Sequence, residues 1–183
     1  MDYSTAFNLN DYVLVKNLIS REAADIINTY TLMRNKLDYS EVVDDFVPNT
    51  KSVYGDYLTE SLMLNLWKKI ENITNIKLLP TYTFYRVYKN NDVLPKHIDR
   101  PSCEISCTLN LGQSHPWKFF ANNNGILLEP GDGIIYKGME VEHWREKFIG
   151  DYYSQVFLHY VNAEGKYKDF FMDKRDDIYG IME

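Results

Sequence analysis

The sequence has few cysteines: only Cys103 and Cys107 occur in 183 residues. Four residues apart on a strand, they would share one face but lie about 13 Å apart, too far for a disulfide. Two cysteines are also too few for a metal site built from thiolates. We therefore expect two reduced, partly buried thiols, as is typical of a cytoplasmic protein.

Long apolar runs and basic clusters are absent as well. No run approaches the roughly 18 apolar residues of a membrane span, and the N-terminus shows no basic-then-apolar signal. The net charge is −6, with 20 Lys and Arg scattered among 26 Asp and Glu. This balance argues against a protein whose affinity for nucleic acid or anionic membranes would need a positive face. We expect a cytoplasmic protein without a nucleic-acid or membrane partner, and the sequence does not predict its oligomeric state.

Aromatic residues, in contrast, are abundant, with 15 Tyr and 9 Phe, and such residues pack well in strands. From Ile76 onward, short runs rich in Tyr, Phe, Val and Ile alternate with turn signals. Many short strands at nearly even spacing indicate a sandwich or barrel. The fold class expected is mainly β with flanking helices.

The first part of the chain predicts the helices that brace this barrel. After a strand over Tyr12–Ile19, Ser20 is a suitable N-cap for a helix from about Arg21 to Lys36. Apolar residues at spacings of three and four predict a second helix from about Leu58 to Ile73. The stretch between the helices, Asp38–Tyr57, has no clear period and is expected to be a long loop.

The length fits one domain. We divide it into a helical part (1–75), a β core (76–161) and a polar C-terminal tail (162–183).

The residues that carry chemistry lie just after an aromatic strand-like run. On a strand, His97 and Asp99 would point to the same face. An imidazole and a carboxylate on one face make two-thirds of a facial site for ferrous iron, and His143, in a later strand-like run, completes the set. The metal ligands predicted are therefore His97, Asp99 and His143.

Two other histidines compete less well. His159 also lies in a strand-like run and is the alternative third ligand, although a packed histidine is the simpler interpretation. His115 lies in a polar turn and is expected to be solvated.

With these residues identified, the sequence resembles the Fe(II)/2-oxoglutarate-dependent oxygenases, particularly their prolyl-hydroxylase-like branch. The resemblance runs from about residue 12 to 161 and rests on three stretches, YVLVKNLISREAADII, FYRVYKNNDVLPKHIDR and LEPGDGIIYKGMEVEHW. It implies a double-stranded β-helix, a jelly-roll or cupin-like barrel whose mouth holds the metal. It also implies Fe(II) as cofactor, 2-oxoglutarate and molecular oxygen as cosubstrates, and ascorbate as a candidate reductant.

The resemblance assigns roles to further residues, with one departure. Tyr88 falls where the branch places a tyrosine that hydrogen-bonds the cosubstrate; ordinary cross-strand packing is the alternative. The branch normally has an arginine about nine residues after the distal histidine, to pair with the far carboxylate of 2-oxoglutarate, but here Tyr152 occupies that position. A dicarboxylate in a partly dry pocket needs a charged partner.

Two residues are the main candidates for that partner. Arg145 shares a strand face with His143, and Lys118 resembles a lysine that related branches use from a middle strand. The remaining alternatives are Lys147, Gln155 acting with tyrosines, or a different cosubstrate.

The expected function is that of a dioxygenase that decarboxylates 2-oxoglutarate to succinate and hydroxylates a substrate, either a peptidyl residue such as proline or a small metabolite. Two rivals remain. One is a cupin-like metal enzyme that does not use 2-oxoglutarate, and the other is a non-catalytic binding module on the same barrel.

Overall fold

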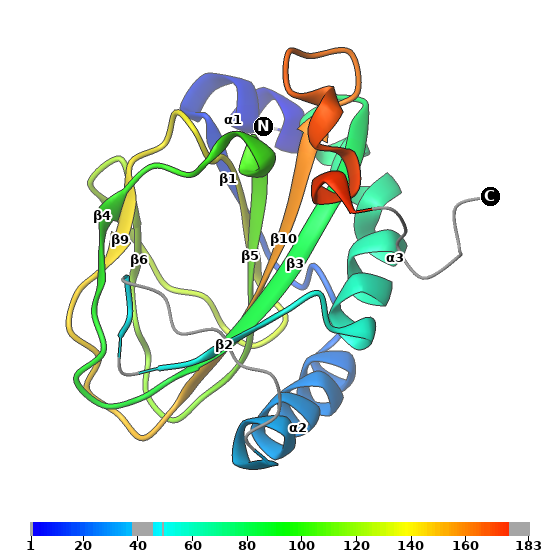
Figure 1. The fold of residues 1–183 in the computed structure, drawn as a ribbon. Helices are drawn as coiled ribbons and strands as arrows, with labels where there is room; N and C mark the ends of the chain where they lie inside the picture. Colours follow the sequence, from blue (N-terminus) through cyan, green and yellow to red (C-terminus); the bar gives the residue numbers. More distant parts are fainter. Residues whose placement is uncertain (1, 38–45, 49, 176–183) are drawn as a thin grey trace.

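Two antiparallel sheets face each other in the computed structural model, which describes residues 2–37, 46–48 and 50–175 (Figure 1). The larger sheet has six strands in the order β1-β8-β5-β10-β3-β2, and the smaller has four in the order β4-β9-β6-β7. Together they form the double-stranded β-helix predicted from the sequence. The strands are β1 (Tyr12–Val15), β2 (Ser52–Tyr54), β3 (Leu78–Tyr88), β4 (Leu94–His97), β5 (Ile105–Gln113), β6 (Phe119–Ala121), β7 (Asn124–Ile126), β8 (Gly133–Lys137), β9 (His143–Arg145) and β10 (Tyr153–Asn162).

The centre of the larger sheet is formed by its three longest strands, with β10 paired between β3 and β5. These strands are buried almost throughout, because helices cover their outer face and the barrel interior covers the other. Pro80 lies within β3 and lacks an N–H group, and the register of β10 shifts opposite it, between Leu158 and Tyr160.

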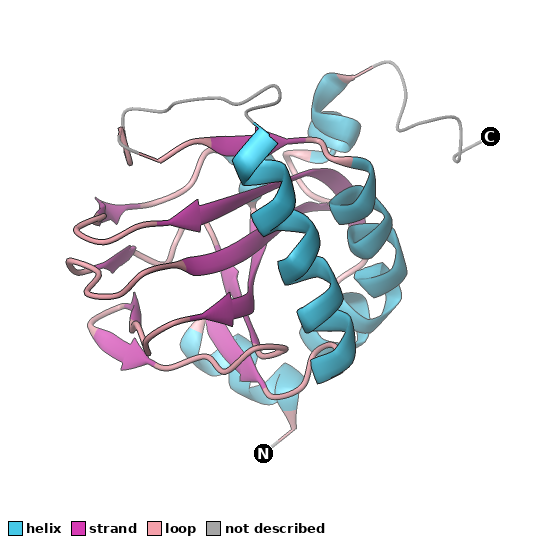
Figure 2. Cartoon of the chain, turned by 90° about the horizontal axis from the view of Figure 1, so that it is seen from below, coloured by secondary structure: helices cyan, strands magenta, loops and turns pink. Residues whose placement is uncertain are grey.

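Helices cover the outer face of the larger sheet (Figure 2). They are α2 (Arg21–Leu37) and α3 (Tyr57–Thr74), and both agree with the predicted ranges to within one residue at each end. As predicted, the hydroxyl of Ser20 caps α2 by accepting from the N–H of Ala23 at 3.2 Å. Asp56 caps α3 in the same way, accepting from the N–H of Leu58 at 3.0 Å.

A core of apolar side chains fills the space between the helices and the sheet. Met63, Leu66 and Ile70 of α3 pack there with strand residues such as Leu109 and Leu158, all buried. This core fixes the larger sheet, so that the opposite face of the sheet is left to line the barrel interior. None of the described helices is both long and apolar enough to cross a membrane.

Several local expectations were wrong. The first strand ends at Val15 rather than Ile19, because Asn17 adopts a left-handed conformation with φ of 49° in the turn that follows. An additional helix, α1 (Tyr3–Asn10), precedes it, with Asp2 as its N-cap. Cys103 lies in a short 3-10 helix, η1 (Pro101–Cys103), rather than on one strand with Cys107; both cysteines are free and buried.

The expected loop and tail contain structure of their own. The range 38–57 holds β2, while residues 38–45 and 49 lie outside the described residues. The tail forms a second 3-10 segment, η2 (Lys168–Lys174), and its residues 176–183 lie outside the described residues. Since β1 and β2 both pair in the larger sheet, strands are not confined to residues 76–161.

Candidate metal centre and cavity

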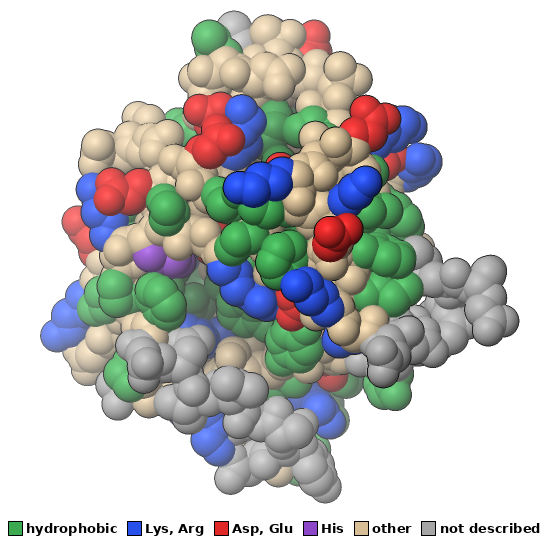
Figure 3. All heavy atoms as spheres, turned by 45° about the horizontal axis from the view of Figure 1, so that its top comes forward, with side chains coloured by type: hydrophobic (Ala, Val, Ile, Leu, Met, Phe, Trp, Pro, Cys, Tyr) green, Lys and Arg blue, Asp and Glu red, His purple; other side chains and the backbone are tan. Residues whose placement is uncertain are grey.

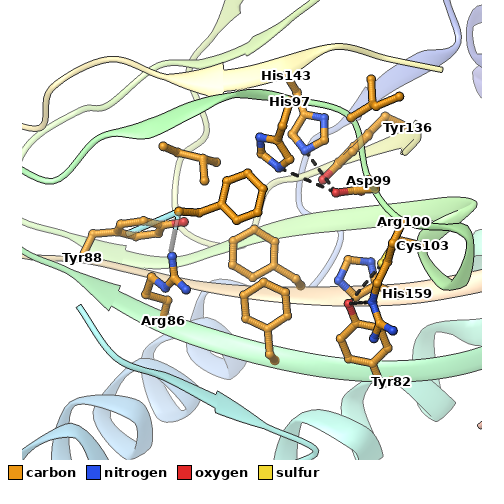
Figure 4. A pocket seen from close by; sticks show the side chains of 15 residues that line it. Tyr82, Arg86, Tyr88, His97, Asp99, Arg100, Cys103, Tyr136, His143 and His159 are labelled. Atoms are coloured by element: carbon orange, nitrogen blue, oxygen red, sulfur yellow. Dashed lines mark hydrogen bonds and ion pairs between the residues drawn. The ribbon is translucent and has the colours of Figure 1, made fainter. Parts of the chain in front are cut away.

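A cavity of about 480 Å³ lies between the two sheets. Its wall on the larger sheet comes from β3 and β10, and its other wall comes from β4, β9 and the segment after β4. Its mouth is on the face shown in Figure 3, where a histidine side chain is visible among hydrophobic ones. The predicted ligands His97, Asp99 and His143 all line this cavity (Figure 4).

Strand pairing brings the two histidines among the predicted ligands together, and Asp99 follows directly after β4. His97, the last residue of β4, is directly opposite His143 on β9, and their ring centroids are 4.2 Å apart. Asp99 lies just beyond β4 rather than on it, and its N–H donates to the carbonyl of Gly138 at 2.8 Å. Its Oδ1 is 3.5 Å from Nε2 of His143 and 3.8 Å from Nε2 of His97. The ligand atoms of the three residues all lie within 4.8 Å of one another.

Hydrogen bonds to the backbone fix the tautomers of both histidines. Nδ1 of His97 is 2.7 Å from the carbonyl oxygen of Pro95, and Nδ1 of His143 is 2.9 Å from that of Val141. A carbonyl oxygen can only accept, so in each neutral ring Nδ1 carries the proton and Nε2 carries a lone pair. Two nitrogen lone pairs and a carboxylate oxygen thus converge on one point. This donor set fits a divalent transition metal, and the backbone bonds orient the imidazoles for it.

The electrostatics keep Asp99 in its anionic form. Burial opposes ionisation, but the hydrogen bond and charge that His143 supplies when its ring is protonated, with smaller contributions from His159 and Ser106, outweigh it and lower the pKa of Asp99. An ionised carboxylate is the form that binds a metal.

His159, the competing third ligand, lies on the opposite wall. It is buried, its Nδ1 is 2.9 Å from Oγ of Ser106, and burial lowers its pKa to about 4. Asp99, Cys103 and His159 also come within 4.8 Å of one another. Burial, however, raises the pKa of the Cys103 thiol to about 12, so a metal binding here would have to displace a proton that the thiol holds tightly. His115 is exposed, as expected.

Arg145 is fully buried and its partners are neutral. Its Nη1 donates to the carbonyl of Trp117 at 2.8 Å, and its Nη2 donates to Gln155 Oε1 at 2.6 Å and to Tyr153 Oη at 3.3 Å. Nε has no hydrogen-bond partner, and no carboxylate of the described residues forms an ion pair with the guanidinium. A buried cation without an anion is costly, so the position favours an anionic ligand.

The other candidates for a carboxylate partner are placed differently. Lys118 is exposed because it alternates with the buried Trp117 and Phe119, and its side chain lies beside Gly125 of β7. Lys147 is also exposed. Both lysine side chains are exposed and outside the cavity, whereas Arg145 is buried in the barrel interior, so the positions of the lysines do not support a role in binding there.

Tyr88 is buried and lines the cavity. Its ring meets that of Trp117 edge-on at 5.0 Å, and the Trp117 ring in turn lies 4.7 Å from the Arg145 guanidinium. Trp117 therefore connects the cavity wall to the environment of Arg145.

Several residues that line the cavity were not predicted from the sequence. Tyr82, Phe84 and Arg86 precede Tyr88 at intervals of two on β3, and all of them line the cavity. Counting back in steps of two from Tyr88 would have identified this face. Arg86 is the residue of most interest, since its guanidinium is buried and lies 5.5 Å from the Tyr88 ring.

Comparison with known proteins finds matches among solved structures. No protein-family model and no curated protein matches the sequence. Among solved structures, a prolyl-4-hydroxylase from Pseudomonas putida matches with a TM-score of 0.70 at 12% identity, covering 87% of this chain and 97% of that one. HygX from Streptomyces hygroscopicus, with nickel and 2-oxoglutarate bound, matches with a TM-score of 0.69 at 10% identity, covering 87% and 86%.

A third match is SnoN, a non-heme alpha-ketoglutarate-dependent epimerase from nogalamycin biosynthesis, with a TM-score of 0.73 at 11% identity, covering 88% of this chain and 81% of that one. At such identities the likeness shows the fold. The chain has the double-stranded β-helix fold of the iron- and 2-oxoglutarate-dependent oxygenases.

Proposed function

We propose that the protein is an Fe(II)- and 2-oxoglutarate-dependent oxygenase whose iron is held by His97, Asp99 and His143. One observation carries the proposal: the lone pairs of two tautomer-fixed imidazoles and an ionised carboxylate converge in the cavity of this fold. Iron bound there would supply the activation of oxygen and the oxidative decarboxylation of 2-oxoglutarate to succinate. Three protein ligands leave three positions of a six-coordinate metal for the cosubstrates.

Arg145 is proposed to bind the far carboxylate of 2-oxoglutarate. It lies two residues after His143 on β9, and both side chains point inward, whereas Trp144 between them points outward and stacks on Phe120. A carboxylate there would supply the anion that the buried guanidinium lacks. Arg86 lines the cavity and Arg145 does not, so Arg86 is the second candidate for this role.

The substrate is proposed to be a small metabolite or a single peptidyl side chain. Aromatic rings form the cavity wall opposite the triad, where Phe84 and Phe157 stack with centroids 4.2 Å apart and Tyr82 continues the row. Such a wall suits a group rich in C–H bonds, the kind of group that a hydroxylase attacks. Tyr88, on the same wall, is proposed to hydrogen-bond the cosubstrate.

The test compares 2-oxoglutarate binding to metal-free protein with binding to Mn(II)-loaded protein by calorimetry, and succinate formation with Fe(II). We expect 2-oxoglutarate to bind tightly only in the presence of metal, and succinate to form only when Fe(II), oxygen and 2-oxoglutarate are all supplied. His143→Ala should lose both properties, and His115→Ala, which alters an exposed histidine, should lose neither.

The two rivals predict different results. Metal binding without any effect on 2-oxoglutarate would favour the cupin-like enzyme, and 2-oxoglutarate binding without succinate would favour the non-catalytic module.

A further inference from the structure

We propose that Ser106 and His159 form a hydrogen-bonded relay that holds Asp99 so that only one of its carboxylate oxygens binds the metal. The proposal rests on the proposed iron site and adds two positioning residues to it. The relay runs from His159 on β10 through Ser106 on β5 to Oδ2 of Asp99 (Figure 4 shows the two ends).

Ser106 determines which oxygen is withheld. Its Oγ lies 2.9 Å from Oδ2 of Asp99 and 3.1 Å from the carbonyl oxygen of Cys103. A hydroxyl has one proton, and the carboxylate is both the nearer and the stronger acceptor, so Ser106 donates to Oδ2. The other oxygen, Oδ1, faces the Nε2 atoms of His97 and His143.

His159 completes the relay. Because the proton of Ser106 is committed to Asp99, Oγ can only accept from His159, so Nδ1 of His159 carries a proton and donates it at 2.9 Å. Nε2 is then an unprotonated nitrogen, and it is buried without a hydrogen-bond partner in the described part of the chain. Leaving a buried acceptor unpaired destabilises the folded protein. An apolar side chain could fill this space without leaving an acceptor unpaired, but it could not donate a hydrogen bond to Ser106.

Gly138 provides the space into which Oδ2 is turned. A Cβ at this position would lie 2.4 Å from Oδ2 of Asp99, 2.2 Å from the carbonyl oxygen of Cys103 and 2.9 Å from Oγ of Ser106. The carbonyl of Gly138 also accepts the N–H of Asp99 at 2.8 Å. Backbone and side chain of Asp99 are thus both fixed, with Oδ2 directed away from the two imidazoles.

The consequence concerns the number of open metal positions. A carboxylate that binds through both oxygens would occupy a fourth coordination position and leave two. A carboxylate that binds through Oδ1 alone leaves three.

The test measures Mn(II) affinity by calorimetry and the number of exchangeable waters on bound Mn(II) by water-proton relaxation. For Ser106→Ala we expect a loss of affinity of about 10- to 100-fold, the usual effect of removing a hydrogen bond to a metal ligand, and one water fewer on the metal. Thr108→Val is the matched control. Thr108 also lies on β5 with a buried hydroxyl, but its Oγ1 contacts Tyr136 Oη at 3.4 Å and makes no hydrogen bond to Asp99.

Two substitutions of His159 separate positioning from packing. The side-chain amide of Asn places an N–H near the position of Nδ1, and that of Gln places its polar atoms near Nε2. We expect His159→Asn to keep Mn(II) affinity within about threefold of the parent and to keep the water count, since its donor reaches Ser106. His159→Gln should behave like Ser106→Ala.

The outcomes are distinguishable. If the parent protein binds no Mn(II), the proposed function fails and the relay fails with it. If the parent binds Mn(II) but Ser106→Ala matches Thr108→Val in affinity and water count, or the two His159 variants behave alike, only the relay is overturned. Thermal unfolding of each variant shows that the measurements are made on folded protein.

Discussion

The guanidinium of Arg145 reaches from β9 in the smaller sheet to β10 in the larger sheet, where it donates to Oε1 of Gln155 at 2.6 Å. Tyr152 occupies the position at which the oxygenases that the sequence resembles normally carry an arginine, and this residue is only half-buried. The buried residues of β10 beyond it, Tyr153 and Gln155, are instead hydrogen-bond partners of Arg145. A cation supplied from the opposite sheet therefore occupies this part of the barrel interior.

Replacing Arg145 by Ala should weaken 2-oxoglutarate binding to the Mn(II)-loaded protein. The change removes a charge-assisted pair in a site with little water, and truncated buried pairs of this kind cost about 2–5 kcal/mol. At about 1.4 kcal/mol per tenfold change, we expect a loss of at least tenfold and up to about a thousandfold. Calorimetric titration with 2-oxoglutarate measures it, and Mn(II) affinity should change little because Arg145 is not a ligand.

Two further substitutions test the alternatives for this role. Lys118→Ala should leave 2-oxoglutarate affinity unchanged, because its side chain is exposed and does not line the cavity. Arg86→Ala identifies the second candidate. If affinity falls with Arg86→Ala and not with Arg145→Ala, the far carboxylate is bound at β3 and our assignment of Arg145 is incorrect.

Metal affinity should depend on all three members of the triad. Asp99→Ala should reduce Mn(II) binding most, because it removes the anionic ligand and leaves two neutral imidazoles. His97→Ala and His143→Ala should each reduce it strongly, and His115→Ala should not. Unchanged Mn(II) titrations for both His97→Ala and His143→Ala would exclude the triad.

The two cysteines should be free but unreactive in the folded protein. Burial raises the pKa of both Cys103 and Cys107 to about 12, so the thiolate that reacts with thiol reagents is scarce at pH 8. We expect two thiols per chain in denaturant without reductant, and slow labelling in the native state. A denatured count of zero would show that these cysteines had been oxidised.

The sequence predicted those features that local patterns determine. The helix beginning at Arg21 has an N-cap and apolar residues at helical spacing, so it was located to within one residue. The sequence predicts His143 on a later strand that completes the set with His97 and Asp99, and the structure pairs it directly with His97. The short helix α1 and strand β2 were missed, since a helix of eight residues and a strand of three carry too few periodic positions to be recognised.

The rest of the site depends on contacts between residues far apart in sequence. Ser106 is an ordinary strand serine until folding brings it to Asp99 and His159. The burial of Arg86 and Arg145 could not be predicted either, because most arginines are exposed and a sequence does not show which ones are buried. Lys118 and Trp117 are adjacent, and only the side-chain direction of the strand decides which points inward.

The last prediction is that His159 makes the metal-free protein less stable as the pH falls. Burial is the main cause that lowers the pKa of His159, from 6.5 to about 4. Between these values the unfolded chain binds a proton that the folded chain does not, so the free energy of unfolding decreases as the pH falls from about 6.5 towards 4. At 1.36 kcal/mol per pH unit, protonation of this one residue makes the free energy of unfolding about 3 kcal/mol lower at pH values below 4 than at pH values above 6.5.

The measurement is urea unfolding of the parent and of His159→Asn at pH values from 7.5 to about 4. Other groups titrate in both proteins, so the difference in unfolding free energy between the two isolates His159. We expect the parent to lose stability relative to the variant across this window, because asparagine has no proton to bind while its amide still donates to Ser106. A constant difference would mean that His159 binds its proton equally well folded and unfolded. That result would overturn the prediction, which rests on the burial of the ring among Tyr82, Phe84 and Phe157.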